Sequence, residues 1–220
     1  MHEWVVFDTF EKAARAAADF LAQQIRDCLQ TRDVCHVILS GGNTPPPCLT
    51  HLVTYDLAWD RVHWYPGDER CYPRGHAERN DVMLQTYLWS KLKTTNVHTI
   101  PAELGPEEAA AAYSKEIDAV DCFDIAFLGM GEDGHTASLF PGNPALQDNR
   151  RVVPVYNAPK PPGERVSFGL QTLKSTRHKM VLASGAAKAP VIARIKKGAL
   201  LPINCLSDIH WYLDSAATVS

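Results

Sequence analysis

The stretch LGMGEDGHTASLFPG, residues 128–142, combines four glycines, two acids and one histidine directly after an apolar run. Asp133 and His135 stand two residues apart across Gly134, so a tight turn can direct a carboxylate and an imidazole into one cleft. An imidazole can take up a proton near neutral pH and return it, which is general acid–base chemistry. A histidine that only caps a turn is the structural alternative, but the flanking glycines favour catalysis. Ser138 lies outside any GxSxG sequence, so an acyl-enzyme serine mechanism is not indicated.

A second segment, SGGNTPPP at residues 40–47, has the residue types of a phosphate-binding turn. Gly41 and Gly42 would let backbone amides turn toward an anion, and Asn43 and Thr44 add side-chain donors before a helix that opens on prolines. A tight strand-to-helix turn without a ligand is the alternative interpretation. The spacing matches neither a Walker A loop nor the dinucleotide fingerprint, so a nucleotide is not the expected ligand.

Charged side chains stand near the ends of further apolar runs. In GDER, Arg70 could clamp a phosphate through two parallel hydrogen bonds, and Asp68 could orient a hydroxyl or take up a proton. Arg165 and Lys188 are further candidate anion ligands. Each of the four, taken alone, is as well explained by a solvated surface, so their coincidence carries the argument. The proline-rich residues 157–164 are expected to form a rigid surface loop that borders a pocket.

The segments that must hold these residues alternate between strand and helix patterns. Apolar, β-branched runs predict strands at 4–7, 34–40, 62–70, 97–100, 123–131 and 178–185. Helices are expected behind Thr9, a suitable N-cap, and over residues 105–120, where proline and acids open an alanine-rich segment. The alternation predicts an α/β fold with a mostly parallel central sheet and helices on both faces. Ligands bind such sheets at the carboxyl ends of the strands, where the polar segments occur.

Composition limits the classes of protein to which the chain can belong. Its 220 residues are 45% hydrophobic and 21% charged, which is ordinary for a folded chain, and we expect a single domain over residues 1–220. A net charge of −3 gives no overall attraction to nucleic acid, so any anion site must be local. Glu3 and Asp8 interrupt the N-terminal apolar segment and no run could span a membrane, which predicts a cytoplasmic protein. Six cysteines without a CxxC pair or zinc-like spacing predict no metal site and no redox motif.

In their order along the chain, these segments resemble the signature blocks of the 6-phosphogluconolactonase family. The blocks are LSGGNTP, GDERCYPRGHAERND, LGMGEDGHTASLFPG, NAPKPPGERVSFGLQTL and SGAAKA. The resemblance implies hydrolysis of 6-phospho-D-glucono-1,5-lactone to 6-phosphogluconate, the second step of the oxidative pentose phosphate pathway, without a cofactor. It also implies a three-layer, Rossmann-like fold that is shared with glucosamine-6-phosphate deaminase. Whether the protein is a monomer or a homodimer is left open.

Read with this resemblance, the candidate residues acquire roles. His135 would deprotonate the attacking water and later protonate the ring oxygen, with Asp133 or Asp68 orienting it. Backbone amides of residues 129–134 would stabilise the oxyanion at C1. The 6-phosphate would be held by seven residues: Gly41, Gly42, Asn43, Thr44, Arg70, Arg165 and Lys188.

Two other functions remain as alternatives. A glucosamine-6-phosphate deaminase would share the fold and the DGH turn. In that family, however, the segment after the histidine would carry a glutamate at the position where this chain has Phe140. A sugar-phosphate sensor without turnover would need the phosphate clamp and would not need both Asp133 and His135. Ammonia release identifies the deaminase, and substitution of His135 separates a sensor from an enzyme.

Overall fold

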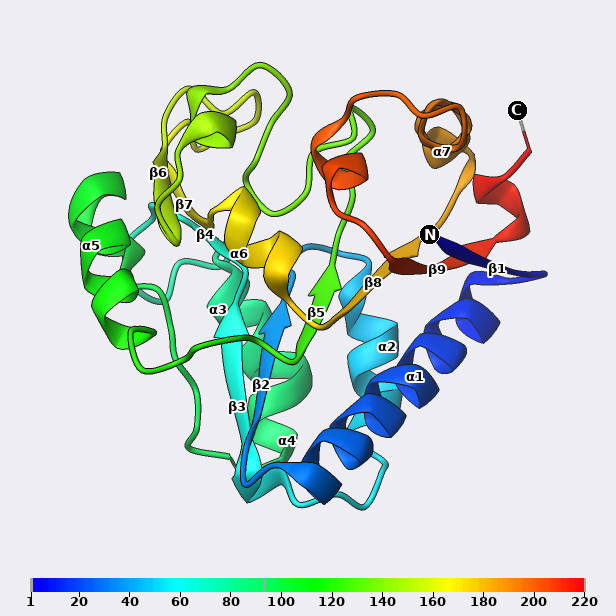
Figure 1. The fold of residues 1–220 in the computed structure, drawn as a ribbon, viewed down its shortest axis with the longest axis horizontal. Helices are drawn as coiled ribbons and strands as arrows, with labels where there is room; N and C mark the ends of the chain where they lie inside the picture. The colour runs from blue at the N-terminus through cyan, green and yellow to red at the C-terminus, as the bar shows by residue number, and fades with distance from the viewer. Residues whose placement is uncertain (1, 93, 220) are drawn as a thin grey trace.

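The computed structural model describes residues 2–92 and 94–219, and its centre is a six-stranded sheet in which all neighbouring strands are parallel (Figure 1). Across the sheet the strands are β1 (Glu3–Phe7), β9 (Ile209–Asp214), β8 (His178–Ala183), β5 (Ile125–Leu128), β2 (Cys35–Leu39) and β3 (Val62–Pro66). The order reverses between β5 and β2, because the chain continues from β2 to β3 on one side and from β5 to β8 and β9 on the other. Ligands of open α/β sheets bind beside such a reversal.

Both faces of this sheet are covered by helices, as the sequence predicts. Side chains of β2 alternate between the two hydrophobic clusters: Val37 and Leu39 point into one, and Ile38 into the other. The cluster that contains Val37 and Leu39 is covered by four helices: α1 (Phe10–Thr31), α2 (Pro45–Leu52), α3 (Asn80–Leu84) and α4 (Ser90–Leu92). The other is covered by α5 (Pro106–Glu116), α6 (Leu170–Ser175) and α7 (Ala189–Lys196). The chain therefore has the predicted α/β architecture.

Helix α1 shows how the sequence fixes one of these layers. Thr9 caps it, as predicted, by accepting a hydrogen bond from the Lys12 amide at 3.3 Å. Its buried stripe consists mostly of alanines, so the helix axis can approach the sheet closely. The larger Leu21 and Ile25 are fully buried, and each contributes roughly 1.5–3 kcal/mol to stability.

A second, antiparallel sheet of three strands branches from the first at Gly67. Its strands are β4 (Asp68–Arg70), β7 (Arg165–Phe168) and β6 (Val152–Val155). The Gly67 amide donates to Leu39 O at 2.8 Å, whereas its carbonyl accepts from the Phe168 amide at 2.9 Å, so one residue belongs to both hydrogen-bonding systems. The predicted strand over 62–70 is therefore wrong as a single element, because Gly67 divides it between two sheets.

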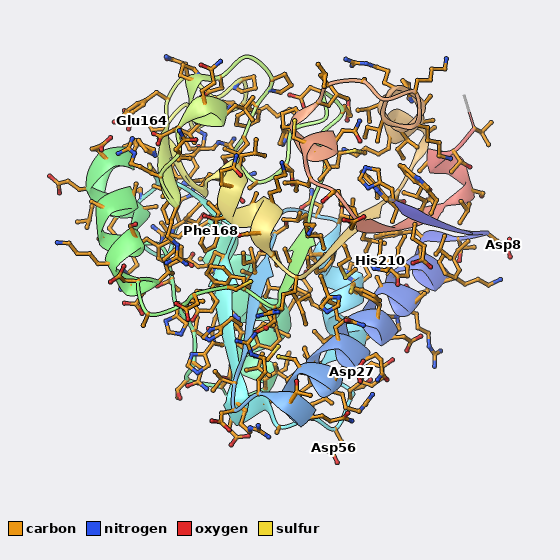
Figure 2. All side chains as sticks on the ribbon, viewed as in Figure 1. Asp8, Asp27, Asp56, Glu164, Phe168 and His210 are labelled. Carbon is orange, nitrogen blue, oxygen red and sulfur yellow. The ribbon has the colours of Figure 1, made fainter. Side chains whose placement is uncertain are left out.

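Other sequence expectations also need correction. The strand expected at 97–100 is only a single bridge between Val97 and Trp64. The Trp64 amide donates to Asn96 O, and the next donor on β3 would be the amide of Pro66, which has no N–H. The strands β6, β7 and β9 were not among those expected. The interior that these elements enclose holds the side chain of Phe168, whereas Asp27 and Glu164 project from the periphery (Figure 2). Among the described residues, no helix combines the length and apolar character needed to cross a membrane.

Candidate active site

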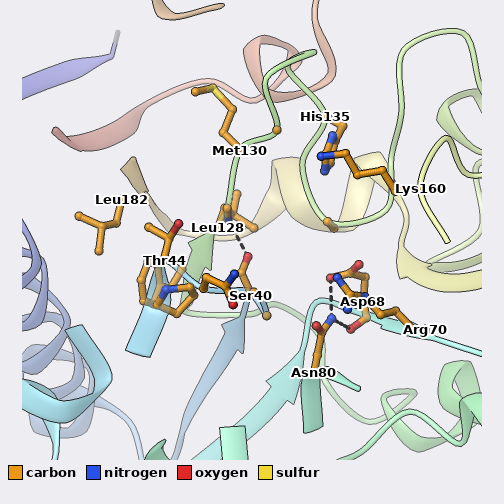
Figure 3. Close-up of a pocket in the computed structure, with 18 of the residues that line it drawn as sticks. Ser40, Thr44, Asp68, Arg70, Asn80, Leu128, Met130, His135, Lys160 and Leu182 are labelled. Atoms are coloured by element: carbon orange, nitrogen blue, oxygen red, sulfur yellow. Dashed lines mark hydrogen bonds between the residues drawn. The ribbon is translucent and has the colours of Figure 1, made fainter. Parts of the chain in front are cut away.

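The main pocket lies where β2 and β5 end, at the reversal of strand order (Figure 3). Its cavity has a volume of about 330 Å³. Ser40, just after β2, holds the two strand ends together: its amide donates to Phe127 O at 2.9 Å, and its hydroxyl accepts from the Gly129 amide at 2.6 Å. The loops that leave these strands therefore begin from a fixed point.

The loop after β5 brings His135 and Asp133 together. His135 Nδ1 lies 2.6 Å from Asp133 Oδ1, and the same oxygen accepts the His135 amide at 3.0 Å. Gly134 allows the turn because its φ is +85°, and its carbonyl accepts from the Ile203 amide at 3.1 Å. His135 lines the pocket and is 22% exposed, whereas Asp133 stands behind it. A carboxylate on one ring nitrogen directs the other nitrogen to the pocket and stabilises the imidazolium.

Hydrogen bonding also accounts for the charge state of Asp133. Burial would raise the pKa of this carboxyl, but the amide, the charge and the ring of His135 together lower it below its ordinary value. Asp133 is therefore an anion at neutral pH. The alternative expectation is that Asp68 supports His135, but among the described residues no hydrogen bond joins these two side chains.

The glycine amides of this loop do not have the role expected of them. The amides of Gly129, Gly131 and Gly134 donate to Ser40 Oγ, His135 O and Gly131 O respectively, at 2.6–3.0 Å. Because each donor already has an acceptor within the protein, these three groups are structural. The prediction that they stabilise an oxyanion is wrong for the glycines of the turn.

Asp68 is held rigidly on another wall of the pocket, at the start of β4. Its Oδ2 accepts from Ser138 Oγ at 2.5 Å. Its Oδ1 accepts from Asn80 Nδ2 at 3.3 Å, a contact that Figure 3 shows. The carboxylate is 7% exposed, and Ser138 is fully buried. The hydroxyl of the buried Ser138 is therefore committed to fixing the Asp68 carboxylate.

Beneath Asp68, the buried Glu69 joins β4 to α3. Its carboxylate accepts the amides of Arg70, Asn80 and Asp81 at 2.8–2.9 Å, which fixes the position from which Asn80 reaches Asp68. Arg79 lies 4.0 Å away as a buried counter-ion. Burial raises the pKa of Glu69 from 4.5 to about 7, against the effect of the three amides.

We predict that Glu69→Gln lowers stability by roughly 1–3 kcal/mol, because an amide nitrogen would face a backbone donor and leave both unpaired. The folded-state pKa of Glu69 is raised, so the folded protein binds more protons than the unfolded chain between pH 4.5 and about 7. The stability that this group contributes is thus present at low pH and is lost as pH rises through that window. Urea unfolding at several pH values checks this: Glu69→Gln should flatten the decline, and an unchanged slope would contradict it.

Four cationic side chains line the pocket: Arg70, Arg165, Lys188 and Lys160. The Lys188 ammonium donates to Met130 O at 2.8 Å, and burial lowers its pKa although Glu132 opposes the shift. Lys160 is exposed and extends from the 157–164 loop toward the side of the pocket where His135 lies (Figure 3). The loop thus borders the pocket, as its prolines predict.

Arg70 and Arg165 form the most concentrated positive charge of the site. They are direct partners in the antiparallel β4–β7 pair, so their side chains leave the same face of the sheet. Burial lowers the pKa of Arg165, and the charge of Arg70 lowers it further, whereas the Asp68 carboxylate opposes the shift. Arg70 Nε is buried and has no hydrogen-bond partner among the described residues. Two arginines held this way can bind an anion between them, and we call this pair the arginine clamp.

The turn after β2 completes the cationic side of the pocket. Gly42 has a φ of +92°, and Gly41 packs so closely on Asn80 that a Cβ atom would lie 1.8 Å from Asn80 Oδ1. Within the described residues no group accepts the amides of residues 41–44, and the Thr44 side chain does not cap α2. Residues 41–44 line the cavity and precede the N-terminus of α2.

The structure brings nearly all predicted site residues to one cavity. Those that line it are Gly41, Gly42, Asn43, Thr44, Asp68, Arg70, His135, Arg165 and Lys188. Asp133 reaches it through His135. Sequence reasoning missed the lining residues Asn80, Phe140 and Lys160, although each lies inside a segment already singled out.

One group of side chains elsewhere has the donor types of a metal site. Atoms of Cys28, Cys35 and Asp124 lie within 4.8 Å of one another at the opposite end of the sheet. Asp124 is already bound by Arg32 at 2.7 Å and by Arg177 at 3.5 Å, and burial raises the pKa of both thiols. Those thiols stay protonated at neutral pH, so this group is better explained as structure.

Known proteins resemble this chain over nearly its whole length. The family model for glucosamine-6-phosphate isomerases/6-phosphogluconolactonase matches residues 8–211. The 6-phosphogluconolactonase of Streptomyces coelicolor is 36% identical over 240 residues, covering 97% of this chain and 92% of that protein. The human 6-phosphogluconolactonase is 34% identical over 234 residues, covering 96% and 91%.

Solved structures agree with this relationship. A 6-phosphogluconolactonase from Thermotoga maritima superposes with a TM-score of 0.92 at 26% identity, covering 98% of this chain and 100% of that one. A monomeric glucosamine-6-phosphate deaminase superposes with a TM-score of 0.85 at 20% identity, which is evidence for the shared fold alone. From the sequence match and the fold together, the chain belongs to the glucosamine-6-phosphate isomerase/6-phosphogluconolactonase family.

Proposed function

We propose that the protein hydrolyses 6-phospho-D-glucono-1,5-lactone to 6-phosphogluconate. The observation that carries the proposal is the His135–Asp133 pair, which opens onto the same cavity as the arginine clamp. A phosphate ester at one end of the substrate and a reactive carbonyl at the other need these two functions a short distance apart. The relatives named 6-phosphogluconolactonase support this choice within the family.

The side of the cavity formed by Arg70, Arg165 and the turn after β2 would bind the 6-phosphate. Arg70 and Arg165 can donate charge-assisted hydrogen bonds to phosphate oxygens through the nitrogens that backbone carbonyls do not occupy, and the amides after β2 would offer donors without charge. Binding the unreactive end orients the lactone, so that C1 lies near His135. Among the described residues that line the cavity, every charged side chain except Asp68 is cationic. The excess of positive charge would stabilise the negative charge that develops at C1.

His135 would move the protons of the reaction. Its Nε2 removes a proton from water as the water oxygen bonds to C1, which gives an anionic tetrahedral intermediate and an imidazolium paired with Asp133. The C1–ring oxygen bond then breaks, and His135 returns the proton to the departing oxygen. The products are a carboxylic acid and a hydroxyl group, and no other reactant is consumed. Asp68, which Ser138 and Asn80 hold in a fixed position, would bind a sugar hydroxyl.

A coupled assay tests this proposal directly. The lactone is generated in situ by glucose-6-phosphate dehydrogenase, the spontaneous rate is subtracted, and ammonia release from glucosamine 6-phosphate is measured in parallel. We expect faster lactone hydrolysis and no ammonia. Ammonia release would instead identify a deaminase, and binding of 6-phosphogluconate by calorimetry without turnover would identify a sensor.

A further inference from the structure

The aromatic ring of Phe140 lies between the two functional halves of the site. Its centroid is 4.5 Å from that of the His135 imidazole, with the planes tilted by 44°, and the Arg165 guanidinium carbon lies 5.5 Å from the same ring centroid. The ring is 3% exposed and lines the pocket. We propose that Phe140 is a positioning residue that sets the imidazole and the guanidinium relative to each other, an inference that rests on the proposed function.

The imidazole needs such support because hydrogen bonding fixes only one of its edges. Asp133 binds Nδ1, and no described residue binds Nε2, the nitrogen that must meet water. A ring held at one nitrogen can still tilt about that bond. Packing against Phe140 restricts the tilt and leaves Nε2 unoccupied, which a second hydrogen bond to that nitrogen would not do.

The Arg165 guanidinium must be held in position by contacts that do not neutralise its charge. Its Nε and one terminal nitrogen donate to the backbone carbonyls of Lys160, Pro161 and Pro162 at 2.9–3.3 Å. Among the described residues, no carboxylate forms an ion pair with it. The face of Phe140 attracts the cation through the ring quadrupole and adds no negative charge. The guanidinium is therefore held in place while its full charge stays available to a phosphate.

The position of Phe140 in the fold makes it a connection between two parts. It belongs to the loop that leaves the parallel sheet after β5, whereas Arg165 begins β7 in the antiparallel sheet. In the lactone, the ring and the rotatable bonds that join it to the phosphate limit the distances that phosphorus can have from C1. The spacing between clamp and base must fall within those limits, and the buried ring sets this spacing.

The test uses Phe140→Leu and Phe140→Met, which fill space without a π face, in the wild-type protein and in an Arg165→Met background. For the phosphorylated lactone, we expect kcat to fall about tenfold, since small displacements of reacting groups have effects of this size. We expect KM to rise several-fold in the wild-type background. In the Arg165→Met background the loss in kcat should persist and the further rise in KM should vanish, which shows that Phe140 acts on KM through Arg165.

Phe123→Leu is the matched control, because this buried ring packs on Tyr65 and Phe168 and does not line the pocket. It should lower the melting temperature, but it should not produce the fall in kcat and the Arg165-dependent rise in KM that are expected of the Phe140 variants. Wild-type kinetics in both Phe140 variants, or KM effects that simply add to that of Arg165→Met, would overturn the proposal. If the leucine variant does not fold, the methionine variant decides.

Failure of the proposed function would be seen separately. If the wild-type protein does not hydrolyse the lactone, the affinity for 6-phosphogluconate, measured by calorimetry, still tests the contact between Phe140 and Arg165. Weaker binding by the Phe140 variants than by Phe123→Leu would support the contact with Arg165. Equal binding would overturn it.

Discussion

Replacing His135 by alanine is expected to lower kcat for lactone hydrolysis by about a hundredfold or more, because general acid–base groups contribute on that scale. The same imidazole would accept the proton from water and return it to the ring oxygen, so both steps lose their proton carrier. Binding of 6-phosphogluconate should change little, since the clamp formed by Arg70 and Arg165 remains. Steady-state kinetics with the lactone formed in situ, together with calorimetry, measure the two quantities.

His51→Ala is the matched control for this variant. His51 belongs to α2, and its Nε2 lies 2.7 Å from Glu11 Oε1 of α1. It lines a neighbouring pocket. Its loss should leave lactone turnover near that of the wild-type protein. If His135→Ala kept more than about a tenth of wild-type turnover, the assignment of the proton carrier would be wrong.

The second large effect is expected from Gly131→Ala, which adds one methyl group beside the His135–Asp133 pair. A Cβ atom at Gly131 would lie 2.0 Å from His135 Nδ1 and 2.6 Å from Asp133 Oδ1, so both side chains must move. The backbone at this position is outside the left-handed region, so alanine should preserve the fold. We expect kcat to fall at least about tenfold, because displacement breaks the orientation of the imidazole.

Gly129→Ala tests whether the effect is specific to the pair. A Cβ atom there would lie 3.6 Å from Ser40 Oγ, which is an ordinary contact. This variant should lose far less activity than Gly131→Ala at comparable melting temperature. Similar losses in both variants would show that the loop as a whole, and not the imidazole–carboxylate geometry, limits the rate.

The parts of the fold that could be predicted are those with local signals. The apolar runs of β2 and β5 are buried on both faces, and Thr9 caps α1 through a contact three residues away. The division of 62–70 at Gly67 could not be predicted, since it depends on hydrogen bonds to Leu39 and Phe168, which are distant in sequence. The antiparallel sheet is missing from the prediction for the same reason.

The candidate site divides in the same way. His135, Arg70 and Arg165 could be proposed because functional side chains gather where strands end. Choosing between Asp133 and Asp68 as the partner of His135 required the actual turn. The sequence also gave no signal that Ser138 and Asn80 fix Asp68, because a buried hydroxyl or amide has no local pattern.

The pairing of Arg70 with Arg165 across β4 and β7 has a thermodynamic consequence. Like charges directly opposite each other on antiparallel strands destabilise the sheet that carries them. Under the proposed function, a phosphate bound between them would remove this repulsion, and because it would bind only the folded chain, occupancy of the site would also oppose unfolding. Since proteases cleave opened chains, the proposal implies that the lifetime of the protein in a cell depends on how much phosphorylated sugar surrounds it.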